Sequence, residues 1–439
     1  MQLSLPSRSD ISLISKPKIK LNMNLGRRMS ADVVGLDIQP GFVAAVKARV
    51  NGSIVAEQAA SVALGPEVVR DGEVMDEEAL SEALREMFAD SKLGKRVRLG
   101  VANQRTVLRT LELPPVTDQK ELAAAVTFQA QDQVPMPLNN AVLDFHPLGV
   151  IETPAGPRQR VVLVAAQRDM VERLLGAVRR AGLTPEGVDL SAFALIRSLY
   201  RADPQQSGRV LYLNVDGLTN LAIAEGTICH FTRVVGGGLE GMATELAERR
   251  GIALIDARAQ LLGGELTAAE IAPASEASAP AQIVLPEPGS VDASDLANGI
   301  VRPPEVHAEE DAGSEPAPDG SQLEPQPVAA RPTPAPAPAQ DNRDAEVLSS
   351  LEAGVREISG EVRNSLDFHR SQEGGGEVSH VVLSGAAQDI KGFAEALQAA
   401  LGVEVRSQTI SLHDDNVARN VSAHRLAVAA GLASSEVAQ

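Results

Sequence analysis

The expected fold depends first on the stretch Val33-Val34-Gly35-Leu36-Asp37-Ile38-Gln39-Pro40-Gly41-Phe42-Val43-Ala44-Ala45-Val46-Lys47. An apolar run ends near the carboxylate of Asp37, turn residues follow at 39–41, and apolar residues resume at Phe42. This pattern predicts a β-hairpin with an acid near its tip. A carboxylate placed there can hold hydrated magnesium while turn N–H groups face a phosphate chain. The pattern fits an ordinary hairpin with a turn aspartate equally well.

Composition limits the possible partners. The chain has 439 residues and a formal net charge of -18, a length typical of roughly two to four domains. Acidity, two tyrosines and the absence of tryptophan argue against a nucleic-acid partner. The single cysteine, Cys229, excludes an internal disulfide and a cysteine metal cluster and fits a reducing cytoplasm. The histidines lack metal-ligand spacing, so we interpret them as structural.

The N-terminal region carries no membrane or export signal. No apolar run approaches the roughly 18 residues that cross a bilayer, and residues 1–30 lack the apolar core of a signal peptide. These residues are basic and weakly patterned. We expect a disordered leader, or a true start at Met23 or Met29; contact with an anionic membrane surface is the alternative.

The first part of the chain has the order of a ribonuclease-H-like half. After the hairpin, 52–64 continues as a strand, 76–93 has helical spacing, and 96–101 and 106–113 are further strands. From Leu113-Pro114-Pro115 to about Pro185 the pattern changes to a small α/β unit with helices at 120–133 and 168–181 and strands at 142–150 and 158–166. An apolar helix over 188–202 then returns to the first half.

A second hairpin indicates internal duplication. Strands are expected at 209–215, 221–224 and 227–235, with a turn at Asp216-Gly217-Leu218-Thr219 and a glycine run at 236–238 before a helix over 239–250. Two such halves would face each other across a cleft.

The region from about 270 to 343 cannot bury enough apolar surface to fold. It holds roughly half of the 27 prolines, together with Ala, Ser, Glu and Asp. We expect a disordered spacer; a dedicated binding segment is the alternative. Helical spacing returns at 344–368. A strand over 378–383, a helix over 390–401, a last strand at 403–405 and a closing helix over 423–433 follow.

These pieces together resemble the PilM family of type IV pilus assembly, actin-like proteins that are related to FtsA. The residues that carry the resemblance are Gly35-Leu36-Asp37-Ile38, Leu113-Pro114-Pro115, Gln129-Ala130, Val134-Pro135-Met136, Val164-Ala165-Ala166, Ala181-Gly182-Leu183-Thr184-Pro185-Glu186, Val188-Asp189, Thr232-Arg233-Val234-Val235-Gly236-Gly237-Gly238, Val382-Leu383-Ser384-Gly385 and Ala427-Val428-Ala429-Ala430-Gly431-Leu432-Ala433.

The resemblance implies an α/β, actin-like ATPase fold of two ribonuclease-H-like halves, with a small α/β insertion subdomain and a long disordered insertion. The expected divisions are a basic leader (1–30), the first half (31–112, closed by 187–205), the inserted subdomain (113–186), the second half (206–266 and 344–435) and a disordered linker (267–343).

The resemblance also implies a partner. This is the cytoplasmic tail of a PilN-like inner-membrane protein, which docks in a groove near the inserted subdomain. The helix over 120–133 and the strand over 158–166 are expected nearby. The chain would then be a cytoplasmic adaptor, recruited to the inner membrane through this tail and other pilus assembly proteins.

The nucleotide site departs from the family pattern. The family's first turn reads Asp-Ile-Gly with small hydroxyl residues and a lysine after it, whereas Gln39, Pro40 and Ala44 stand here. If ATP binds, the resemblance assigns its contacts to Asp37 (also as a water-mediated magnesium ligand), Gly41, Asn214, Asp216, Gly217, Thr219, Gly236, Gly237, Gly238 and Gly385. Loss of several polar contacts, each about 1 to 3 kcal/mol, predicts that Mg-ATP binds weakly or not at all. No catalytic residue is expected, and neither is ATP hydrolysis.

Two other functions remain open from the sequence. Asp37 and the duplicated halves also fit an ATP-dependent small-molecule kinase of the actin-like superfamily. An FtsA-like division protein would need a C-terminal membrane helix, which 434–439 does not offer.

Overall fold

The computed structural model describes residues 33–202, 208–266, 339–372, 374–414, 417 and 421–434. The described residues other than Ala339 belong to one compact unit. The expected leader at 1–30 and most of the expected linker at 267–343 lie outside the described residues. Helix α7 begins at Ala339, inside the range expected to be linker.

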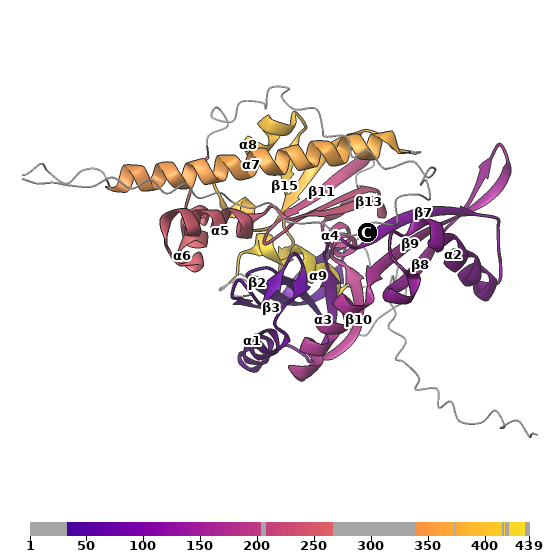
Figure 1. Ribbon diagram of the computed structural model, residues 1–439, viewed down its shortest axis with the longest axis horizontal. Helices are drawn as coiled ribbons and strands as arrows, with labels where there is room; N and C mark the ends of the chain where they lie inside the picture. The colour runs from indigo at the N-terminus through magenta and orange to yellow at the C-terminus, as the bar shows by residue number, and fades with distance from the viewer. Residues whose placement is uncertain are drawn as a thin grey trace, which may run out of the picture. The chain divides into compact units, whose positions relative to one another are not determined.

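The first lobe is built on a mixed six-stranded sheet (Figure 1). Its strands, in spatial order, are β10 (Thr184–Leu190), β6 (Arg96–Val101), β1 (Val34–Gln39), β2 (Phe42–Asn51), β3 (Ser53–Ala63) and β16 (Ser411–Leu412). Its helices are α1 (Glu77–Asp90), α3 (Arg168–Arg180), α4 (Ser191–Leu199) and α9 (Ala427–Ala433), and a short pair, β4 (Val69–Arg70) and β5 (Glu73–Val74), precedes α1.

The second lobe repeats this arrangement. Its sheet runs β13 (Ile228–Val235), β12 (Thr219–Glu225), β11 (Arg209–Val215), β14 (Val378–Ser384) and β15 (Val405–Ser407). Its helices are α5 (Leu239–Arg250), α6 (Leu254–Leu262), α7 (Ala339–Ser371) and α8 (Phe393–Leu401). Starting from β3 in the first sheet and from β13 in the second, two antiparallel strand pairings are followed by two parallel ones. The duplication expected from the sequence is therefore present, and the fold is actin-like.

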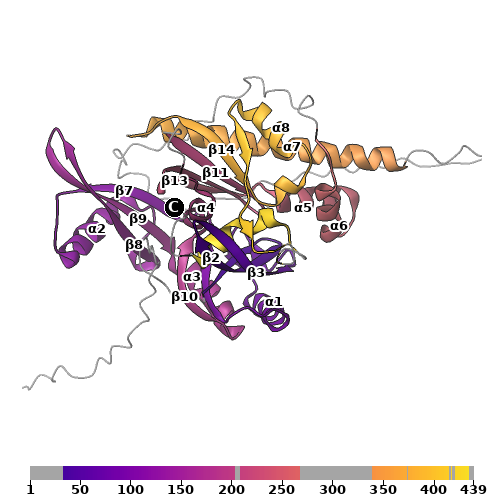
Figure 2. The same ribbon diagram turned by 180° about the vertical axis from the view of Figure 1, so that it is seen from behind.

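Helix α7 packs its apolar stripe on the second sheet. Residues spaced three and four apart lie on one side of the helix, and these are buried in the core of the second lobe: Val347, Leu351, Val355, Ile358, Val362 and Leu366. Figures 1 and 2 both show α7 beside α8, and Arg363 joins them by donating to the carbonyl oxygen of Ala400 at 2.8 Å.

Helix α9 fits against the first sheet because its residues are small. A Cβ at Gly35 would collide with the backbone of α9, and one at Gly431 would collide with the carbonyl oxygen of Ala194 in α4. Arg98, 2% exposed, donates to the carbonyl oxygens of Leu432 at 3.0 Å and Ser434 at 2.9 Å. This caps the C-terminal end of α9.

A third sheet forms the inserted unit, in the order β7 (Val107–Leu113), β9 (Gly156–Gln167) and β8 (Ala141–Thr153), with α2 (Gln119–Gln133) on one face. Asp118 caps α2 by accepting from Lys120 and Glu121 N–H groups at 2.9 and 3.0 Å.

Several expected element boundaries were wrong. The strand ending at Leu113 pairs with β9 and so belongs to the inserted sheet, whereas Thr184–Leu190 is strand β10 of the first lobe. The insertion therefore starts and ends earlier than the expected 113–186. The helix expected over 188–202 begins only at Ser191, because the three residues before it complete β10. The last strand begins at Val405 rather than at 403.

Candidate functional site

The two hairpin turns lie directly against each other. The β1–β2 turn comprises Pro40 and Gly41, and Gly41 has a φ of 77°, a conformation that favours glycine. The β11–β12 turn comprises Asp216, Gly217 and Leu218. A Cβ at Gly217 would collide with the carbonyl oxygen of Pro40, so the backbones of the two lobes are in contact where the sequence predicts phosphate.

Asp37 is buried and satisfied within the first hairpin. It is 2% exposed and accepts a hydrogen bond from Gln39 Nε2 at 2.8 Å. The carbonyl oxygen of the same amide accepts from the Leu218 N–H at 3.4 Å, so Gln39 bridges the two turns. Burial raises the pKa of Asp37 to about 7, and the nearby Asp216 acts in the same direction.

Asp216 is paired with an arginine of the C-terminal region. Arg425 Nε lies 3.1 Å from both carboxylate oxygens of Asp216, and a terminal guanidinium nitrogen donates to Oδ1 as well. The guanidinium carbon lies 3.5 Å from the centre of the Phe42 ring. Burial disfavours the charged arginine, but Asp216 raises the pKa of Arg425 overall.

Arg425 connects the lobes through its position in the chain. It lies on the 3-10 helix Ala423–Leu426, which continues into α9 of the first lobe. The neighbouring carbonyl oxygen of His424 accepts from the N–H of Gly385 at 3.0 Å and from Ser384 Oγ at 3.2 Å, both in the second lobe. The N–H group of the Gly385 turn, an expected nucleotide contact, is thus already hydrogen-bonded.

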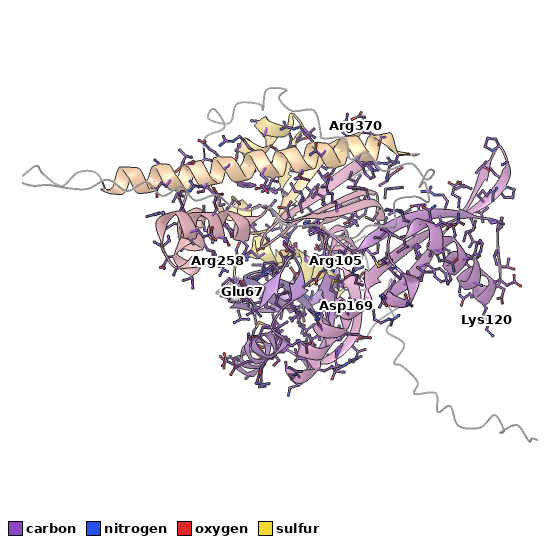
Figure 3. All side chains as sticks on the ribbon, in the orientation of Figure 1. Glu67, Arg105, Lys120, Asp169, Arg258 and Arg370 are labelled. Carbon is purple, nitrogen blue, oxygen red and sulfur yellow. The ribbon has the colours of Figure 1, made fainter. Side chains whose placement is uncertain are left out.

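The other expected contact residues are also engaged by protein. A Cβ at Gly41 would meet the ion pair between Glu240 and Arg258, the latter labelled in Figure 3. Glycines at the remaining turns approach backbone or side chains of the second lobe: Gly237 approaches Glu357, Gly238 the carbonyl oxygens of Asp216 and Gly217, and Gly385 the Val215 backbone. Gly236 is exposed.

Asn214 and Thr219 are buried in the second sheet. Asn214 lies one residue before the end of β11 and is 3% exposed. Thr219 is fully buried, and its hydroxyl has no hydrogen-bond partner among the described residues.

These residues do not fit a magnesium–phosphate group. A hydrated ion needs carboxylate oxygens that face water, whereas Asp37 is buried against Gln39 and Asp216 is neutralised by Arg425. Across the described ranges there is no group of three His, Cys, Asp or Glu residues able to hold a metal.

A separate apolar cavity of about 210 Å³ lies where the inserted sheet meets both lobes. Its lining comes from β8 and β9, from β10 and α4, and from the start of β13 with the turn before it: His146, Pro147, Leu148, Val162, Asp189, Phe193, Ile196, Arg197, Thr227, Ile228 and Cys229. Its charged lining residues, Arg197 and Asp189, form a buried ion pair, 2.5 Å apart. Ile228 is 41% exposed at its rim.

The strand alternation of β9 decides which elements reach this cavity. Val162 lies on the face toward the first lobe, whereas Val161 and Leu163 lie on the opposite face, packed on α2. Figure 3 shows Lys120, at the start of α2, on the outer side of the inserted sheet. The expected strand over 158–166 thus contributes to the cavity wall, but the helix over 120–133 does not.

Sequence reasoning missed the two arginines that define these places. Arg425 and Arg197 were not singled out, and neither lies in a local motif. Asp189 enters the sequence analysis only through the family resemblance. The one sequence signal for a buried ion pair is the arginine eight residues after it, Arg197.

Comparison with known proteins supports this fold. The family model described as type IV pilus assembly protein PilM matches residues 35–216. A solved structure titled "PilM-PilN type IV pilus biogenesis complex" has a TM-score of 0.63 and 20% identity, covering 92% of this chain and 97% of that chain. The resemblance to the PilM family expected from the sequence is thereby confirmed.

Two other solved structures are less similar to this chain. The ethanolamine utilization protein EutJ of Carboxydothermus hydrogenoformans has a TM-score of 0.43 and 13% identity, covering 91% of this chain and 88% of that chain. MreB5 of Spiroplasma citri, solved with ADP, has a TM-score of 0.41 and 11% identity, covering 91% of this chain and 94% of that chain. Among the described residues, no helix is long and apolar enough to cross a membrane.

Proposed function

We propose that this PilM-like chain is a cytoplasmic adaptor of type IV pilus assembly that binds the cytoplasmic tail of a PilN-like inner-membrane protein. The observation that carries the proposal is the family match over 35–216, a range that includes the inserted sheet and α4. The similar solved structure is itself a PilM-PilN complex. The adaptor would reach the inner membrane through this tail and through other pilus assembly proteins.

The apolar cavity is the proposed docking site for the tail. Its walls are mainly aliphatic and aromatic, which suits the apolar side chains of an extended peptide. The buried Arg197–Asp189 pair supplies fixed polar groups at one wall, where it can orient peptide backbone. The exposed Ile228 would pack on the peptide at the rim.

We further propose that the adaptor works without nucleotide. Arg425 and Gln39 hold the two turns together, so the lobes need no bound Mg-ATP to stay closed. The same contacts disfavour the kinase alternative, because a phosphate-transfer enzyme needs open turns and carboxylates that are free to bind metal.

The test is saturable binding of a synthetic peptide that carries the cytoplasmic start of a PilN-like single-span protein. Fluorescence anisotropy should give the same dissociation constant with and without 1 mM Mg-ATP. Ile228→Asp should weaken binding by tenfold or more, because it places a charge at an apolar rim.

The matched control is Ile255→Asp on α6, since Ile255 is also exposed, at 63%, but does not line the cavity. It should leave binding unchanged. An absence of saturable binding would contradict the adaptor function. Equal weakening by both variants would show that the apolar cavity is not the docking site. Binding that requires Mg-ATP would contradict only the nucleotide-independent mechanism.

A further inference from the structure

A second cavity, of about 650 Å³, lies between the inserted sheet and the second lobe. Unlike the apolar cavity, its wall is rich in cationic and imidazole side chains. We call it the basic cavity and define it by its charged and aromatic lining residues: Arg109, Glu112, Arg160, Arg209, Glu225, His230, Phe231 and His369. Neither the adaptor function nor the expected nucleotide site uses these residues.

The arginines outnumber the carboxylates that could neutralise them. Arg209 lies 3.7 Å from Glu225, which is also 3.8 Å from His230. Arg160 stands opposite Glu112 in the β7–β9 ladder but makes no ion pair within the described residues. Arg109 donates to the carbonyl oxygen of Leu108 at 2.9 Å and makes no ion pair with any residue that the structure describes. With neutral histidines the cavity carries an excess of one positive charge (three arginines and two glutamates).

One buried polar atom in this wall has no partner. His369 is 3% exposed, its Nε2 lies 2.9 Å from Arg209, and its Nδ1 makes no hydrogen bond to any described residue. Buried polar groups in proteins are nearly always hydrogen-bonded. Because arginine can only donate, Nε2 accepts from Arg209, and Nδ1 of the neutral imidazole carries the proton that can be donated to an anion.

Burial and the arginines of the basic cavity lower the pKa of both histidines in its wall. Burial lowers the pKa of His230, and Arg209 and Arg160 lower it further. Burial likewise lowers the pKa of His369, with Arg209 and His230 acting in the same direction. A bound anion would oppose these effects and raise both pKa values.

We infer that the basic cavity binds a small phosphate-bearing molecule. Guanidinium groups bind phosphate oxygens in pairs, and imidazole N–H groups complete the hydrogen bonding. The volume is that of a small-molecule site, and Phe231 offers an aromatic wall beside the charges. Because the wall is shared by the three strands of the inserted sheet and by β11, β12, β13 and α7 of the second lobe, the ligand would hold these parts together.

The experiment uses the full chain and pyrophosphate as the probe. Titration calorimetry at constant ionic strength should show saturable binding, and Arg160→Gln should weaken it about tenfold through loss of one charged hydrogen bond. Arg158→Gln is the matched control, because Arg158 lies two residues earlier on β9 and does not line the cavity. It should change the affinity less than twofold.

Histidine NMR supplies a second measurement that does not depend on affinity. Pyrophosphate should raise the pKa of His230 and His369 but leave that of His146, in the apolar cavity, unchanged. Absence of binding, equal weakening by Arg158→Gln, or an unchanged pKa of both cavity histidines would overturn the inference. So would saturable binding of a glutamate decapeptide with none of pyrophosphate, which would identify a site for acidic peptide instead.

Discussion

The hairpin turns of the two lobes occupy equivalent places in a duplicated fold, yet the buried acid at each turn has a different kind of partner. In the first lobe Asp37 contacts a neutral amide, and its pKa is raised to about 7. In the second lobe Asp216 is matched by the guanidinium of Arg425. Only one of the two acids therefore has a full counter-charge inside the protein.

This difference indicates how an actin-like cleft can be closed by protein alone. A nucleotide between such turns would bring its own cation and phosphates, which interact with both lobes. Here Arg425, just before α9, forms an ion pair with Asp216 of the second turn. Gln39, beside the first turn, accepts a hydrogen bond from Leu218 of the second. The positive charge and the hydrogen bonds come from side chains, so the arrangement is independent of any ligand's concentration.

The largest expected effect comes from removing the counter-charge of Asp216. Arg425→Met should lower the free energy of unfolding by about 3 to 5 kcal/mol, because it leaves a buried carboxylate unpaired. Urea denaturation at pH 8 measures this. Addition of Asp216→Asn to the same chain should recover much of the loss, since the second turn then holds no unpaired carboxylate.

The matched control is Arg406→Met. Arg406 pairs with Glu404 at the surface, where an ion pair contributes less than about 1 kcal/mol. If Arg425→Met cost no more than this control, the ion pair would not hold the second turn.

Asp37 should give a smaller effect that depends on pH. Its folded pKa, about 7, exceeds its ordinary value of 3.8, so between these pH values the folded state holds a proton that the unfolded state has lost. Stability contributed by this group is therefore full below pH 4 and is lost as pH rises through 7. Asp37→Asn should remove that loss and add roughly 2 to 4 kcal/mol at pH 8.

Thermal and urea unfolding between pH 4 and pH 8 would test this. The difference between variant and parent should be near zero at pH 4 and reach its maximum above pH 7. Asp169→Asn, at an exposed position in the first turn of α3, should show no such trend. A flat difference for Asp37→Asn would mean that the carboxylate is ionised in the folded protein at all these pH values.

The sequence predicts the two hairpins and an altered first turn, but it does not predict the arginine that pairs with Asp216. The hairpins and the stripe on α7 follow from local periodicity, and Gln39 and Pro40 already signalled an altered turn. Arg425, however, lies 209 positions from Asp216, and no local pattern links them. Likewise, alternation identified β7 as a strand without showing that it would pair with β9 rather than with the first sheet, because strand partners are set by tertiary packing.

The smallest expected effect tests whether the two turns touch. Gly217→Ala adds a Cβ that would collide with the carbonyl oxygen of Pro40, and we expect a loss of about 1 to 3 kcal/mol in the free energy of unfolding as the turns separate. Gly65→Ala is the control, because its Cβ would meet only Val68 Cγ2 at 3.8 Å, an ordinary contact. Equal stability of the two variants would show that the backbones of Gly217 and Pro40 are not in contact in solution, and closure without nucleotide would then depend on the ion pair between Arg425 and Asp216.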